Sequence, residues 1–144
     1  MIVPDANLLL YVYDASSPFH SKSAAWLSAC LSGKEPIGFC PSVIFSFVRI
    51  GTSAKAFAEP LTVDEASEHV ESWLKQPVSQ ILNVDRTDVR KALELLRAAG
   101  TGGNLTSDAQ VAAVALRQRA VVHTADSDFA RFPNVRWYNP LLNH

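Results

Sequence analysis

Three aspartates that lie far apart in the chain, Asp5, Asp108 and Asp126, are the residues whose positions could support chemistry. Asp5 ends the first apolar run of the chain, and Asp126 follows the apolar run 120–124 within two residues. In a parallel sheet both acids would lie beyond the carboxyl ends of strands, where ligands bind. A helix that leads into the second of these strands starts at the same edge, so an expected helix over 107–119 brings Asp108 there too,. We therefore expect the three carboxylates to converge.

A cluster of carboxylates at such an edge predicts a site for a divalent metal ion. Asp108 shares a helical face with the apolar residues Val111 and Ala112, so its carboxylate points along the buried side of the helix,. Asp128 adds a fourth acid two residues after Asp126. Each acid alone is explained as a helix cap or a first-turn acid. Together they would repel one another unless a cation neutralised them, and oxygen ligands in an open cleft suit Mg²⁺ or Mn²⁺.

The elements that must position these acids alternate between short apolar runs and amphipathic segments. The sequence predicts strands at 2–5, 36–40, 80–84 and 120–124, and helices at 7–13, 18–33, 41–52, 63–76, 87–99 and 107–119,. Strands that alternate with helices favour a mainly parallel sheet of four or five strands, with right-handed crossovers and helices on both faces. We therefore predict an α/β fold, a three-layer α/β/α sandwich that forms one domain over residues 1–144.

Local signals mark where two of these helices begin and end. Ser17 followed by Pro18 predicts an N-cap with proline at the first helical position,. Gly33 predicts a left-handed stop for the same helix,. Thr62 and Glu65 have the spacing of a capping box, in which each side chain bonds to a backbone N–H of the other residue,.

The composition is that of a globular chain. With 48% hydrophobic and 19% charged residues, 144 residues suffice for a single buried core,. No segment approaches the roughly 20 apolar residues of a membrane span. Pro4 and Asp5 interrupt any signal-peptide pattern, so we expect no membrane association and a cytoplasmic location,. A net charge of -1 gives no global basic surface, so any contact with nucleic acid must be local,.

Three segments together resemble PIN-domain proteins, specifically the VapC-type toxins of bacterial toxin–antitoxin pairs. They are residues 1–13, the stretch 103–109 with the alanine-rich helix after it, and residues 124–132, so the resemblance covers essentially the whole chain. It implies a ribonuclease that acts on RNA, depends on Mg²⁺ or Mn²⁺ and is usually a homodimer. It also implies a small cognate antitoxin whose C-terminal segment covers the acidic cleft and holds the enzyme inactive.

The resemblance also assigns roles to individual residues of this chain. It implies metal binding and catalysis by Asp5, Asp108 and Asp126, with Asp128 as a further metal ligand and Asn7, Ser46 and Thr124 in supporting positions. One departure concerns the helix expected over 41–52. The family usually has a glutamate three residues before an arginine there, whereas Ser46 precedes Arg49 at that spacing in this chain. Because a serine adds no charge, we expect lower metal affinity or lower activity than is usual.

Two classes of function follow from these observations. The first is a metal-dependent endoribonuclease that acts as a toxin. The second, which Ser46 favours, is a catalytically weakened PIN-fold interaction module that binds an antitoxin or RNA without efficient cleavage. A phosphatase of the haloacid-dehalogenase type would need a second aspartate in place of Asn7 and is disfavoured. Phe45, Phe47 and Phe57 lie close together in the sequence and predict apolar surface beyond one core, as in a homodimer,.

Overall fold

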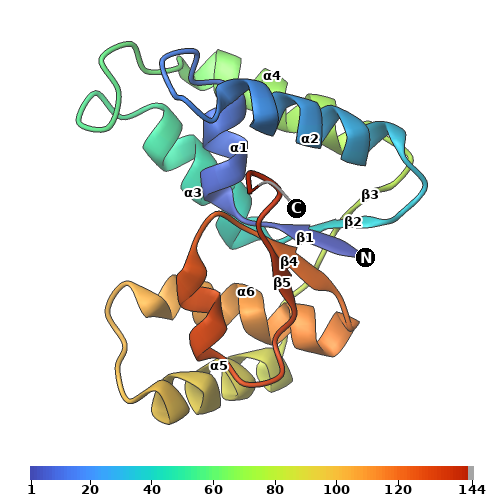
Figure 1. Cartoon of the computed structure of the whole chain (residues 1–144), viewed down its shortest axis with the longest axis vertical. Helices are drawn as coiled ribbons and strands as arrows, with labels where there is room; N and C mark the ends of the chain where they lie inside the picture. The colour runs from blue at the N-terminus through green and yellow to red at the C-terminus, as the bar shows by residue number, and fades with distance from the viewer. Residues whose placement is uncertain (143–144) are drawn as a thin grey trace.

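Five short strands form one sheet through the centre of the molecule (Figure 1). The structure is a computed structural model and describes residues 1–142. The strands are β1 (Ile2–Pro4), β2 (Ile37–Phe39), β3 (Ser79–Ile81), β4 (Val121–His123) and β5 (Trp137–Tyr138), in the order β3-β2-β1-β4-β5. Every pairing is parallel, which confirms the predicted sheet. Because β1 and β4 are neighbours, the chain segments that follow them emerge side by side.

Helices cover both faces of this sheet, which confirms the three-layer α/β/α arrangement (Figure 1). One layer contains α1 (Ala6–Val12), α2 (His20–Ser32), α3 (Pro41–Gly51) and α4 (Val63–Leu74). The other contains α5 (Arg86–Ala99) and α6 (Leu105–Gln118), and a short 3₁₀ helix, η1 (Ser127–Arg131), follows β4. Within residues 1–142, no helix combines the length and the apolar character that a bilayer crossing requires.

Helix α6 is the element that holds Asp108 in place. Its residues Val111–Ala115 are all buried, because α6 packs against both α5 and the strand β4 that follows it. Three of these five residues are alanines, whose small side chains let neighbouring elements approach closely,. Asp108 lies in the first turn of this helix, as predicted, and it is only partly exposed. A buried helix with few degrees of freedom therefore fixes the position of the carboxylate.

The predicted helix ends are correct at one helix and wrong at another. Thr62 and Glu65 form the expected capping box, with N–H to oxygen distances of 3.1 and 3.0 Å. Ser17 does not cap α2, because its hydroxyl accepts a hydrogen bond from the Phe19 N–H in a turn and the helix begins only at His20. Gly33 ends α2 in an extended conformation rather than a left-handed one (φ -81°, ψ -165°). The chain needs that extended exit to reach β2.

The expected surface cluster of phenylalanines is also wrong. Phe47 is fully buried and packs edge-on against Trp73, so it belongs to the core. Phe45, two residues earlier on α3, points to solvent and is 69% exposed. Phe57 lies in the connection after α3 and lines a cavity that Phe47 also borders. Phe45 and Phe47 therefore face opposite sides of α3, since a two-residue step turns a helix by about 200°.

Candidate metal centre

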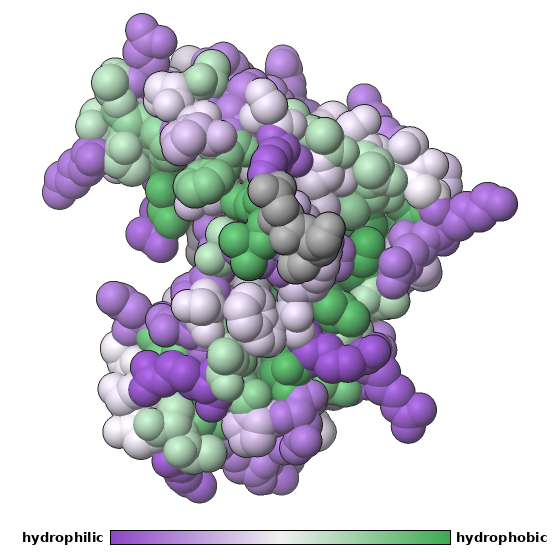
Figure 2. Space-filling view, in the orientation of Figure 1, coloured by the Kyte–Doolittle hydropathy of each residue, from purple (hydrophilic) through white to green (hydrophobic). Residues whose placement is uncertain are grey.

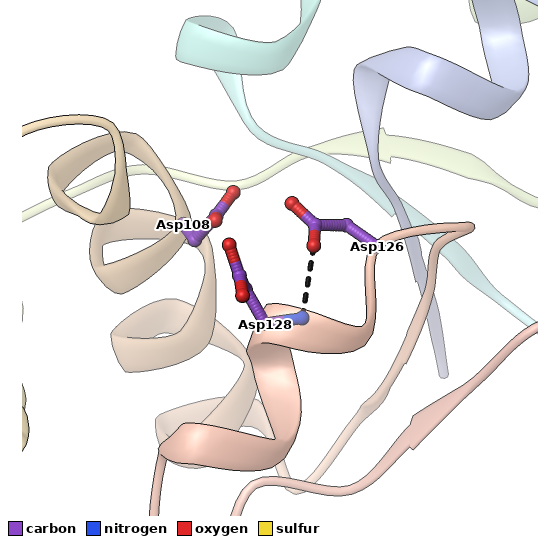
Figure 3. Close-up of side chains that lie close together, drawn as sticks. All are labelled: Asp108, Asp126 and Asp128. Atoms are coloured by element: carbon purple, nitrogen blue, oxygen red, sulfur yellow. Dashed lines mark hydrogen bonds between the residues drawn. The ribbon is translucent and has the colours of Figure 1, made fainter.

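Three carboxylates meet where α6 begins and where β4 has ended (Figure 3). Asp108 comes from the first turn of α6, Asp126 is the N-cap of η1, and Asp128 lies in the first turn of η1. Each offers one oxygen atom, and these three oxygens lie within 4.8 Å of one another. Asp126 Oδ1 accepts a hydrogen bond of 2.8 Å from the Asp128 backbone N–H, which ties the two acids together. This spacing suits shared coordination of one divalent cation.

Asp5 stands beside this group rather than inside it. Among residues 1–142, the tight cluster contains Asp108, Asp126 and Asp128. Both oxygens of Asp5 already accept hydrogen bonds: Oδ1 from the Ala6 N–H at 2.8 Å, and Oδ2 from the Thr124 hydroxyl at 2.8 Å. The three acids predicted first therefore come to one edge of the sheet. However, Asp128 takes the closer place that we expected of Asp5.

Thr124 is the residue that joins the ends of β1 and β4. Its buried hydroxyl donates to Asp5 Oδ2 and accepts a hydrogen bond of 2.9 Å from the Asp126 N–H. Asn7 completes the link, because its Nδ2 donates to Thr124 Oγ1 at 3.3 Å and its Oδ1 accepts from the Ala125 N–H at 3.2 Å. The two supporting residues predicted from the sequence thus fix the backbone that carries Asp126.

Thr124 was predicted as a supporting residue, and the specific hydrogen bonds that it makes also have a local signal in the sequence. A threonine directly after a strand, two residues before an aspartate, can accept the N–H of that aspartate in a local turn. The hydrogen bond from the Asp126 N–H to Thr124 Oγ1 is such a turn. Because the hydroxyl oxygen accepts this hydrogen bond, the single hydroxyl proton can be donated to a carboxylate that follows another strand, as it is to Asp5.

The electrostatics of the cluster favour a cation. Burial, followed by the charges of Asp5, Asp126 and Asp128, raises the pKa of Asp108 to about 7. Burial also raises the pKa of Asp5, although the hydrogen bonds from Thr124 and Ala6 oppose this. The ion pairs found among residues 1–142 involve other acids, namely Glu35, Glu94 and Asp88. An uncompensated group of carboxylates is a donor set that matches a hard divalent ion such as Mg²⁺ or Mn²⁺.

Ser46 lies in the middle of α3. This helix follows β2, and β2 is the neighbour of β1 in the sheet. The Ser46 side chain is partly buried, and within the described residues it makes no hydrogen bond to the four acids. No carboxylate replaces it on α3, because the helix contains neither aspartate nor glutamate. Its supporting role in the site therefore stays a prediction.

A histidine near the site has a structural role. His123, at the end of β4, accepts a hydrogen bond of 2.9 Å at Nδ1 from the indole N–H of Trp26. Burial lowers the pKa of His123 to about 4, so the ring is neutral at physiological pH. The pair braces α2 against the strand that leads into Thr124.

The chain is similar to known proteins along almost its whole length. The family model described as the PIN domain matches residues 2–135. Ribonuclease VapC33 of Mycobacterium tuberculosis is 40% identical over 141 residues, which cover 98% of this chain and 99% of that protein. Ribonuclease VapC37 of the same species is 38% identical over 140 residues, covering 97% of each chain.

Solved structures show the same fold at low sequence identity. M. tuberculosis VapC20, described as a Sarcin-Ricin loop cleaving toxin, has a TM-score of 0.69 at 16% identity and covers 94% of this chain and 99% of its own. VapBC2 from Rickettsia felis, bound to a DNA fragment from its promoter, has a TM-score of 0.66 at 18% identity and covers 96% and 98%. The structural matches concern the fold, whereas the family model and the two closer relatives establish kinship. The chain belongs to the PIN-domain family, in its VapC branch.

Proposed function

We propose that this protein is a Mg²⁺- or Mn²⁺-dependent endoribonuclease that acts as the toxin of a toxin–antitoxin pair. The observation that carries the proposal is the convergence of Asp108, Asp126 and Asp128 at the carboxyl edge of the sheet, three carboxylates that form no ion pair with a basic residue among residues 1–142. Its relatives VapC33 and VapC37 are named ribonucleases. Because the substrate is RNA, we place the activity in the cytoplasm.

The residues of the site divide into ligands and supports. Asp108, Asp126 and Asp128 would hold the ion, and Asp5 lies beside them as a further ligand or as an acceptor for an ordered water. A divalent cation at this position supplies charge neutralisation at a phosphodiester and lowers the pKa of a water that attacks it. Thr124 holds the backbone of Asp126 in place, so that the ligands need no rearrangement when the substrate arrives,.

A second candidate function is a weakened interaction module, and one observation favours it. Ser46 supplies no charge where the family usually has a glutamate, so this site has one carboxylate fewer. Asp128 compensates for the missing glutamate, because it lies within the tight cluster and brings the number of close carboxylates to three. We therefore prefer the active enzyme.

The proposed antitoxin has an apolar place to bind in the same helical layer as α1 and α3. A cavity of about 340 Å³ lies between the end of α1 and the connection that follows α3. Apolar and aromatic side chains make up most of its wall, among them Leu10, Tyr13, Phe47, Phe57 and Leu61. A bulky apolar side chain of a partner would fill such a cavity.

The proposed homodimer has a different surface. Val84, Val89 and Leu93, at the start and along the outer side of α5, are each about half exposed (52%, 53% and 48%). With Ala92 and Leu96 they line a shallow groove of about 220 Å³ between α5 and α6. A contiguous apolar stripe of this kind favours contact between two copies of the chain.

The function is tested by RNA cleavage with purified protein that is free of any partner. We expect cleavage with Mg²⁺ or Mn²⁺ and none in excess chelator. Asp126→Asn should lose about 3 kcal/mol of transition-state stabilisation, or roughly a hundredfold in rate. Asp64→Asn, which changes an exposed acid on α4, serves as the matched control and should cleave normally. Cleavage that persists in chelator, or that survives Asp126→Asn, contradicts the proposal.

A further inference from the structure

We propose that Phe45, on the outer face of α3, is a platform on which a base of single-stranded RNA stacks beside the metal centre, with Arg49 contacting the adjacent phosphate. The inference rests on the proposed ribonuclease function and extends it. It names the form of RNA that the protein takes and a residue that positions it.

The hydrophobic core does not use the side chain of Phe45. At 69%, it is the most exposed of the large hydrophobic side chains in the described part of the chain. Its neighbours Val43, Ile44 and Phe47 are all buried and already supply the inner face of α3. A phenylalanine held in water forgoes the stabilisation that burial would give it. The side chain is therefore available to an external partner.

The surroundings of Phe45 suit a polyanion better than a protein. Ser42, Phe45 and Arg49 follow one another on the same side of α3, at spacings of three and four residues, and all three are exposed,. Residues 36–58 contain two basic residues, Arg49 and Lys55, and no acid. A single aromatic ring between serines and an arginine lacks the contiguous apolar area of a protein interface. It has the components of a single-strand site, namely a ring for a base and a cation for the backbone.

The position of α3 places this ring within reach of the acids. The helix begins directly after β2, and β2 is hydrogen-bonded to β1, whose chain continues into Asp5. Adjacent strands lie about 4.8 Å apart, and the four residues from Pro41 to Phe45 rise about 6 Å along the helix. Because β4 lies one strand beyond β1, the start of α3 is two strand spacings, or roughly 10 Å, from the end of β4, a distance that a few nucleotides span,.

The shape of the molecule offers a path for the strand. Figure 2 shows a deep notch between the two helical layers, on the side where β1 and β4 end in Figure 1. Helix α3 borders this notch from one layer, and the start of α6 borders it from the other. A single strand that enters along α3 would stack a base on Phe45 and present a phosphodiester to the acids. The stripe on α5 that we assign to the homodimer lies on the opposite layer, so dimer formation leaves this path free.

The test measures binding of a fluorescently labelled single-stranded RNA of about ten nucleotides, a length within the span of known single-strand sites. All proteins carry Asp108→Asn, so that the RNA is not cut. We expect Phe45→Ala and Phe45→Leu to weaken binding by roughly 5- to 100-fold, whereas Phe45→Trp retains it, because stacking needs an aromatic face. Arg49→Ala should reduce the slope of log affinity against log salt by about 0.7, and Phe45→Ala should leave that slope unchanged.

Phe19→Ala is the matched control, because Phe19 is also an exposed aromatic residue (43%) but lies between α1 and α2. It should bind RNA like the parent. Three results overturn the stacking role: binding that survives Phe45→Ala, binding that Phe45→Leu retains, or sedimentation in which Phe45→Ala converts a dimer into a monomer. If the wild-type protein cleaves RNA while Phe45→Ala leaves KM unchanged, this inference alone fails. If the parent neither binds nor cleaves any RNA, the proposed function fails with it.

Discussion

Replacing Asp108 with asparagine should stabilise the metal-free protein while removing its response to metal. The substitution keeps the shape of the side chain and removes one charge from the cluster. Burial and the neighbouring acids raise the pKa of Asp108 from its ordinary 3.8 to about 7. A tenfold change in proton affinity corresponds to about 1.4 kcal/mol, so the ionised carboxylate costs at most about 4 kcal/mol. Because Asp108 is partly exposed, screening by solvent reduces this to about 2 kcal/mol,.

The sign of the effect depends on pH in a defined way. Between about pH 4 and pH 7 the folded protein keeps the proton on Asp108, whereas the unfolded chain has released it,. The stability of the wild-type protein therefore falls as pH rises through this window and levels off above pH 7. Asp108→Asn does not lose stability in this way, because asparagine does not ionise. We expect it to melt roughly 6 °C above the wild type at pH 8 without metal, and with little difference at pH 4.

Thermal unfolding with and without Mn²⁺ provides the assay. A ligand at a hundred times its Kd adds about 2.7 kcal/mol to the stability of the protein that binds it. The wild type should gain this stability, and Asp108→Asn should gain much less. Glu71→Gln, an exposed acid on α4, is the control and should behave as the wild type does in both conditions. Identical melting of wild type and Asp108→Asn at pH 8, with equal shifts in Mn²⁺, would refute the idea that these acids form one metal site.

Three further substitutions test other parts of the structure. Thr124→Val removes the hydroxyl that donates to Asp5 and that accepts hydrogen bonds from the Asp126 N–H and from Asn7 Nδ2. It should cost about 1–3 kcal/mol in unfolding experiments and 10- to 100-fold in cleavage rate, whereas Thr124→Ser should restore both. Arg117→Ala removes the ion-pair partner of Asp88, whose side chain is 2% exposed. Thermal unfolding should show that the free energy of unfolding falls by about 2–3 kcal/mol while the affinity for Mn²⁺ stays unchanged. A variant that melts like the wild type would contradict this. Ser46→Glu should tighten Mn²⁺ binding about tenfold, which calorimetry would measure as about 1.4 kcal/mol, and it should lower the stability of the metal-free protein,. An unchanged affinity for Mn²⁺ would mean that position 46 faces away from the site.

Much of the fold could be predicted because its signals are local. The alternation of strands and helices follows from hydrophobic periodicity, and the capping box of Thr62 and Glu65 involves residues three positions apart,. Helix α5 ends at Gly100, which adopts the left-handed conformation (φ 76°) that favours glycine at such a stop,. Gly33 failed the same rule because the following chain turns into β2, and that path depends on the position of the sheet.

The arrangement within the site could not be predicted, because it depends on contacts between distant parts of the chain. The hydrogen bond from Thr124 to Asp5 joins residues 119 positions apart. It occupies one oxygen of Asp5, while the Ala6 N–H occupies the other. Strand order and chain direction were enough to bring the acids to one edge. They could not tell that Asp128, rather than Asp5, completes the tight group.

Asp88 and Asp108 have similar positions in their helices, yet one is a structural acid and the other a functional one. Each lies in the first turn of its helix, α5 or α6, where a negative charge is favourable,. Burial opposes the ionisation of Asp88, yet hydrogen bonds from Arg117 and the Asp85 N–H hold its pKa below the ordinary value. Its charge is therefore neutralised within the protein.

Asp108 has the opposite environment. Its charged neighbours are other acids, and its pKa is raised rather than lowered. The helix dipole explains why an aspartate is tolerated at the start of α6, but it does not explain why further carboxylates of η1 face it. The fold holds those carboxylates in place with neutral donors, such as the Asp128 N–H that bonds to Asp126. Within the described part of the chain, no lysine or arginine forms an ion pair with them. Once Asp108 is ionised, a cation from solution that binds these acids stabilises the fold, and this is why we assign the metal to Asp108 and not to Asp88.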